Sequence, residues 1–142
     1  MIRIYFIDGN NLLGKIKNRN ISTREKLSHL LDRVFNNKKI DIHLFFDGYA
    51  KEPIRTNKIK IFYSDDKTAD EIIKIKIEQS KNPKLINVIT SDFNLSQFAN
   101  KCSCKVTTSE NFATELFQNK LDDEQEKIKN INNEEVKKLF GL

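Results

Sequence analysis

The sequence has few of the residues that indicate a disulfide-rich, zinc-binding or nucleotide-binding protein. Its 142 residues include no tryptophan, two cysteines and four glycines. Cys102 and Cys104 are one residue apart, which suits neither a disulfide framework nor a four-ligand zinc site, so we expect both thiols to be reduced. The glycines form neither a phosphate-binding loop nor a dinucleotide-binding fingerprint, which argues against a nucleotide cofactor.

Long hydrophobic runs are also missing. No apolar segment approaches the roughly 20 residues that cross a membrane, and the opening MIRIYFIDGN has no signal-peptide core. We therefore expect a cytoplasmic protein without membrane contact. A hydrophobic content of 38% beside 32% charged residues can build a core beneath a charged surface, and the length fits one domain.

This single domain is expected to span residues 1–142, with residues 122–142 forming a polar segment and a short terminal helix. The apolar side chains of that helix, Val136, Leu139 and Phe140, are spaced to lie on one face. We expect the face to pack on the same chain rather than on a partner, because small domains need all of their apolar surface.

The charge is basic and unevenly distributed. The total of +5 divides into +7 for residues 1–121 and −2 for residues 122–142, because six acidic residues and four lysines follow Leu121. A basic surface favours polyanions. Lysine, asparagine and isoleucine are abundant throughout, however, and an AT-rich genome gives the same bias. Charge alone therefore leaves nucleic-acid binding and a merely solvated lysine-rich surface equally open.

Short apolar runs alternate with amphipathic segments. The pattern predicts five strands, over residues 2–7, 40–46, 59–63, 85–89 and 105–107, the first ending in a turn at residues 8–11. It predicts helices over residues 23–36, from residue 68 to Pro83, around Leu95–Ala99 and around Phe112–Phe117. Capping-box spacings at residues 22–25 and 68–71 support the first two. This order predicts an α/β fold, a three-layer αβα sandwich with a mostly parallel sheet.

Four aspartates follow predicted strands at positions that meet in such a sheet. Asp8, Asp47 and Asp92 come at strand ends, and Asp70 is in the first turn of a helix. Carboxyl ends of parallel strands share one edge, so the four carboxylates should converge there and repel unless a cation offsets them. Oxygen ligands select Mg²⁺ or Mn²⁺. Taken singly, each aspartate also fits a turn or helix-cap role.

Other polar residues accompany these acids. Asn10, Asn11, Thr90 and Ser91 either tighten the chain locally or bind a phosphate or metal-bound water, and both readings stay open. Nine basic residues around the edge could contact the substrate: Lys15, Lys17, Arg19, Arg24, Lys51, Arg55, Lys58, Lys60 and Lys67. Among them, Lys15 and Arg55 are the predicted substrate-binding residues. Tyr49, Tyr63 and Phe93 are candidates for stacking on bases.

Several of these motifs together resemble the NYN branch of the PIN-like nucleases, and in particular its bacterial YacP-like members. The motifs are Phe6–Leu12, Phe46–Gly48, Thr68–Asp70, Ile89–Asp92 and Ser109–Phe112. The similarity runs from the first strand to about Leu121, and Glu135–Gly141 looks like the family's terminal helix. The segment from Tyr49 to Lys58 has no counterpart that we can align.

The resemblance implies a PIN-like fold with strand order 3-2-1-4-5 and a metal-dependent ribonuclease site. Asp8, Asp70 and Asp92 match the family's metal-binding acidic cluster, Asp47 is a fourth catalytic acid, and Asn10 matches a polar position after the first acid. The implied partner is RNA, which we expect to be single-stranded and to be cut internally by metal-activated water. A ribosome-bound or translation-linked RNA is left open as the substrate, and the oligomeric state is not predicted.

Three other functions compete with this one. A non-catalytic RNA-binding module would keep the same fold and the same basic surface. A receiver-like phosphoacceptor domain also places aspartates around Mg²⁺, but it needs paired acids after strand one and a lysine after strand five, where this chain has Asp8 alone and Val106–Thr108. A DNA flap nuclease needs a helical arch for which the chain is too small.

Overall fold

The computed structural model describes residues 2–118. The predicted polar segment over residues 122–142 and the terminal helix with Val136, Leu139 and Phe140 lie outside the described residues. Within residues 2–118, every helix is too short or too polar to span a bilayer.

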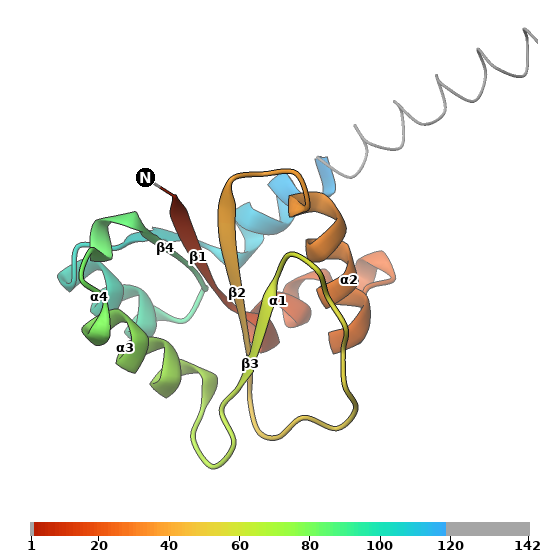
Figure 1. The fold of residues 1–142 in the computed structure, drawn as a ribbon, viewed down its shortest axis with the longest axis horizontal. Coiled ribbons are helices and arrows are strands. Elements are labelled where there is room, and N and C mark those ends of the chain that lie inside the picture. Colours follow the sequence, from red (N-terminus) through yellow and green to blue (C-terminus); the bar gives the residue numbers. More distant parts are fainter. Residues whose placement is uncertain (1, 119–142) are drawn as a thin grey trace, which may run out of the picture.

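A five-stranded sheet forms the centre of the molecule (Figure 1). Its strands are β1 (Arg3–Asp8), β2 (Ile40–Phe46), β3 (Lys60–Tyr63), β4 (Ile86–Ile89) and β5 (Lys105–Thr107). They lie in the order β3-β2-β1-β4-β5, and all four pairings are parallel. The predicted fold class and strand order are therefore confirmed. Receiver domains have the different order 2-1-3-4-5, which excludes that alternative.

Helices cover both faces of the sheet. They are α1 (Gly9–Ile16), α2 (Arg24–Phe35), α3 (Ala69–Gln79), α4 (Phe93–Lys101) and a helical segment over residues 109–118, with short 3₁₀ turns η1 (Lys17–Arg19) and η2 (Pro83–Leu85). In Figure 1, α3 and α4 lie on one side of β1, and α1 and α2 lie on the other. The sandwich thus has the three predicted layers.

Alternating side chains of the central strands supply the two halves of the core. Phe6 and Phe45 pack with α3 and α4, whereas Ile7, Leu44 and Phe46 pack with α1, α2 and residues 112–117. Fully burying each such side chain contributes roughly 1.5–3 kcal/mol. Both faces of the sheet are anchored in this way. The packing therefore fixes the positions of the strand ends, which carry the polar residues, relative to one another.

The first helix was not predicted. The residues after β1 read as a turn because glycine and asparagine disfavour helices, yet α1 begins directly at Gly9, with Asp8 as its N-cap. Burial of Leu12 and Ile16, four residues apart, outweighs the weak propensity. The cap of α2 also differs from the prediction: Thr23, rather than Ser22, accepts a hydrogen bond, from the backbone N–H of Lys26 at 3.1 Å. The capping box at Thr68 is confirmed.

Candidate active site

Asp8 is the central acid of the carboxyl-terminal edge of the sheet. It is the last residue of β1, opposite Phe45 of β2, and only 9% of its surface is exposed. Its Oδ2 accepts a hydrogen bond from the Thr90 hydroxyl at 3.1 Å, and its Oδ1 accepts one from the backbone N–H of Asn11 at 3.4 Å. Because Ile7 pairs with Ile89, Thr90 stands level with Asp8, and the parallel register creates this contact.

Asp47 and Asp70 lie close enough to Asp8 for their charges to act on it. Asp47 is exposed after β2, and its Oδ1 accepts a hydrogen bond from the N–H of Ala69 at 2.6 Å, which ties it to the start of α3. Asp70 is the second residue of α3, and its Oδ2 pairs with Lys74 at 3.0 Å. Within residues 2–118, Oδ1 of Asp70 is buried and has no hydrogen-bond partner.

Asp92 is the outermost of the four acids. Its side chain is exposed, and its Oδ1 caps α4 by accepting from the N–H of Leu95 at 2.8 Å. The Thr90 hydroxyl accepts from the N–H of Asp92 at 3.1 Å while donating to Asp8, so one side chain links the two aspartates. The cap role foreseen for Asp92 is thus real, and the Thr90 hydroxyl also ties Asp92 to the central acid.

The two asparagines after Asp8 fasten neighbouring strand ends to β1. Oδ1 of Asn10 accepts from the N–H of Asp47 at 2.9 Å. Oδ1 of Asn11 accepts from the N–H of Ser91 at 2.9 Å and from the hydroxyl of Ser109 at 2.6 Å. These oxygens therefore hold the edge together, which is the local role that the sequence left open for them.

Ser109 and Glu110 belong to this edge, although neither is among the predicted site residues. Glu110 accepts a hydrogen bond from the Ser91 hydroxyl and pairs with Lys15 at 3.0 Å. These two contacts, that of Ser91 first, lower the pKa of Glu110 to about 2. Lys15, predicted to contact substrate, is thus neutralised by a carboxylate. The signal that could have identified both residues is their place directly after the fifth strand.

Burial is the main electrostatic influence on Asp8. It raises the pKa of this carboxyl to about 6, although the hydrogen bonds from Thr90 and Asn11 act in the opposite direction. The charges of Asp47 and Asp70 raise it further. The central acid therefore sits where its ionised form is costly unless positive charge is brought in.

Comparison with protein families identifies the family of the domain. A family model described as the YacP-like NYN domain matches residues 5–140. The chain belongs to this family. NYN domains are nuclease-like members of the PIN-like superfamily, so the protein is a ribonuclease-type NYN domain, as the sequence motifs predicted.

Solved structures show the same fold. The NYN domain resembles the crystal structure of Rae1 (YacP) from Bacillus subtilis with a TM-score of 0.76 and 19% sequence identity, over 97% of this chain and 87% of that one. It resembles the W164L mutant of the same protein with a TM-score of 0.72 and 17% identity, over 94% and 86% of the two chains. A search of curated proteins finds no match.

Arg55, the other basic residue singled out, is exposed in the segment between β2 and β3 of the NYN domain. That segment, residues 47–59, borders the edge where the acids meet, since it begins at Asp47 itself. The sequence prediction that Arg55 contacts substrate is neither supported nor opposed by its surroundings, and it stays a prediction.

The raised pKa of Asp8 predicts how the stability of the NYN domain changes with pH. A carboxyl whose pKa is higher in the folded than in the unfolded state stabilises the fold most below pH about 4, and this contribution is lost as the pH rises through about 6. In metal-free buffer at pH 7, Asp8→Asn should therefore be more stable than the wild type, by up to about 3 kcal/mol.

Urea unfolding of both proteins in EDTA between pH 4 and pH 7.5 measures this difference. The advantage of the variant should shrink as the pH falls, because the wild-type carboxyl becomes protonated. Groups that do not interact with residue 8 cancel in the comparison. A difference that is the same at every pH would contradict the burial of a titrating Asp8.

Proposed function

We propose that this NYN domain is a metal-dependent ribonuclease that cleaves RNA internally at the carboxyl-terminal edge of its sheet. The observation that carries the proposal is the meeting of Asp8, Asp47 and Asp70, whose charges repel, at an edge where Asp8 is buried. Keeping one buried carboxylate ionised beside two other acids destabilises the fold and is therefore a sign of function.

The side chains at this edge suit a hard divalent cation such as Mg²⁺ or Mn²⁺. All of the acidic donors are carboxylate oxygens, and the buried Oδ1 of Asp70 lacks a partner among the described residues. Within residues 2–118, no three acidic, histidine or cysteine side chains are already grouped at metal-binding spacing. We infer that Asp70 exchanges its contact with Lys74 for the ion, which Asp8, Asp70 and Asp92 would hold, with Asp47 beside them.

The chain itself contributes orientation and charge. Thr90 and the Asn11 N–H fix the two oxygens of Asp8, and Asn10 and Asn11 hold the ends of β2 and β4 against β1. When bound, the ion supplies a water of lowered pKa and neutralises charge on the phosphate. Asp8 must be ionised to hold a cation, so its pKa should fall when the ion binds.

The expected substrate is single-stranded RNA. The basic body attracts the backbone without reading its sequence. Phe93, directly after Asp92, is 71% exposed, and Tyr49 is 59% exposed, so both rings are available for stacking on unpaired bases. An RNA-binding module that does not cut RNA is the second candidate, since the same residues would serve it.

A cleavage assay tests the proposal. End-labelled RNA and DNA of the same sequence are incubated with the full chain in Mg²⁺, in Mn²⁺ or in EDTA. We expect internal cuts in the RNA with either metal and none in EDTA. RNA that stays intact in both metals but binds the protein would favour the non-catalytic module, and cutting that is unaffected by EDTA would contradict metal dependence.

Binding in EDTA should be strongly salt-dependent, because each lysine or arginine that contacts a phosphate releases counterions. Affinity for single-stranded RNA, measured by fluorescence anisotropy, should fall steeply between low and physiological salt. An affinity that does not change over this range would show that the basic surface is not used.

A further inference from the structure

A groove of about 460 Å³ lies beside the acidic edge, on the face of the sheet covered by α2. It is lined by Thr23, Arg24 and Glu25 at the start of α2, by Lys51, Glu52 and Ile54 from the segment between β2 and β3, and by Tyr63 at the end of β3. Its size falls in the range of roughly 300–1,000 Å³ that is usual for small-ligand sites.

Arg24 joins the groove to the acids. Its Nη2 donates a hydrogen bond to the backbone carbonyl of Asp47 at 2.7 Å, and its guanidinium lies 5.0 Å from the centre of the Phe46 ring. The ring of Tyr63 is 6.0 Å from that of Phe46. Arg24 would therefore contact both a molecule in the groove and Asp47. The charge of Asp47 in turn acts on Asp8.

The lining of the groove indicates what kind of group it accepts. Arg24 and Lys51 are balanced by Glu25 and Glu52, so the groove has no net charge to hold a bare phosphate. The Tyr63 ring and the Ile54 side chain instead provide an aromatic and aliphatic wall, which suits a flat base. A carboxylate accepts hydrogen bonds from an exocyclic amino group. Uracil has a carbonyl oxygen where cytosine has its amino group, and it retains only its N3–H as a donor on that edge.

We propose that this groove receives the nucleoside beside the scissile phosphate, and that it prefers a base with an exocyclic amino group over uracil. The inference rests on the proposed action on RNA. Tyr63 stacks on the base, Glu52 accepts from its amino group, and Lys51 contacts the adjoining phosphate.

Binding of labelled oligo(C) and oligo(U), measured by fluorescence anisotropy in EDTA, tests the groove separately from cleavage. The wild type should bind oligo(C) several times more tightly than oligo(U). Glu52→Gln should abolish most of that preference. Tyr63→Leu should weaken binding of both by about tenfold, whereas Tyr63→Phe keeps the ring and should bind normally.

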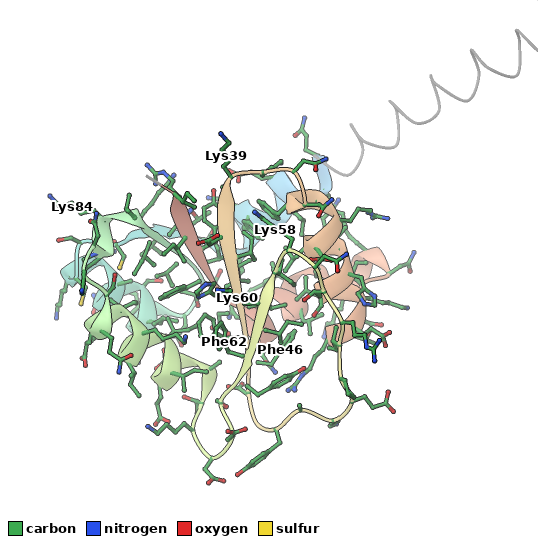
Figure 2. The ribbon with its side chains drawn as sticks, in the orientation of Figure 1. Lys39, Phe46, Lys58, Lys60, Phe62 and Lys84 are labelled. Carbon is green, nitrogen blue, oxygen red and sulfur yellow. The ribbon has the colours of Figure 1, made fainter. Side chains whose placement is uncertain are left out.

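Lysine variants supply a matched control. Lys51→Gln should lower the slope of log affinity against log salt by about 0.7, the value for one phosphate contact of a single strand. Lys84→Gln removes the same charge from an exposed lysine of η2, at the left of Figure 2 and away from Phe46, and should leave the slope unchanged. Melting curves identify any variant that fails to fold, and Glu52 and Lys51 are exposed.

The outcomes separate this inference from the proposed function. Equal binding of oligo(C) and oligo(U) would contradict the proposed nucleoside site in the groove, and so would wild-type binding by both Lys51→Gln and Tyr63→Leu. Neither result would contradict metal-dependent RNA cleavage. If the variants have the expected effects on binding but no RNA is cleaved in Mg²⁺ or Mn²⁺, the nucleoside site in the groove is supported and the proposed ribonuclease activity is contradicted. No binding of either oligonucleotide would overturn the groove as a nucleoside site.

Discussion

Asp8→Asn is expected to reduce the rate of RNA cleavage by on the order of a hundred- to a thousandfold. A divalent ion at the carboxylates stabilises charge by several kcal/mol in the transition state, and each 1.36 kcal/mol lost costs a factor of ten in rate. Asp8 is the acid placed at the centre of the edge, on the middle strand, so its loss should affect any ion that the others share. Single-turnover cleavage of end-labelled RNA in Mg²⁺ measures the effect.

The substitution is well suited to separating catalysis from folding. The asparagine oxygen can still accept from the Asn11 N–H, and its amide N–H can donate to the Thr90 hydroxyl in place of the bond that Asp8 accepts. The variant should also be more stable than the wild type at pH 7. Asp70→Asn and Asp92→Asn should follow closely in their loss of activity, and Asp47→Asn should be milder. If the folded Asp8 variant cleaves RNA as fast as the wild type, the assignment of the site is wrong.

Gly9→Ala is expected to destabilise the domain by on the order of 3 kcal/mol and to lower its melting temperature by about 10 °C. A Cβ at this position would lie 2.6 Å from the carbonyl oxygen of Phe45 and 2.6 Å from a ring carbon of Phe46. Both phenylalanines are fully buried in β2, so neither can move without disturbing the core on its face of the sheet. Thermal unfolding followed by circular dichroism checks this.

Gly14→Ala is the matched control, because it makes the same chemical change in the same helix. A Cβ at Gly14 would meet nothing within 4 Å. Replacing glycine with alanine in a helix normally adds roughly 0.5–1 kcal/mol of stability, so this variant should melt at or above the wild-type temperature. Equal melting temperatures for the two variants would show that the start of α1 is not packed closely against β2 at Gly9.

The sequence predicted the sheet well because each strand is a compact apolar run with a clear stop. One Asp–Gly pair spans the end of β1 and another follows β2, and the acids at strand ends could be placed on one edge by topology alone. The same turn-forming residues led to a wrong prediction at residues 9–11, where a turn was expected and α1 begins. A helix that begins without a connecting turn looks like a turn when its first residues are glycine and asparagine.

What the sequence could not supply is the pairing of distant residues. The residues that lie beside Asp8 on the neighbouring strands depend on the register of two strand pairs. The sequence of one strand alone does not determine that register. The contact from Thr90 and the raised pKa of Asp8 both depend on it. The groove beside Tyr63 is likewise formed by three segments that a linear pattern does not connect.

The bonds of Asn11 have a consequence for how the protein is made. Its side-chain oxygen joins partners that lie 80 and 98 residues further along the chain. Contacts between such distant residues form late in folding, because a long loop must close first. During synthesis Asp8 therefore leaves the ribosome long before the residues that fix its surroundings, and the edge is complete only after Ser109 has emerged. Until then, the nascent chain lacks part of the hydrogen-bond network that holds the residues around Asp8 in place.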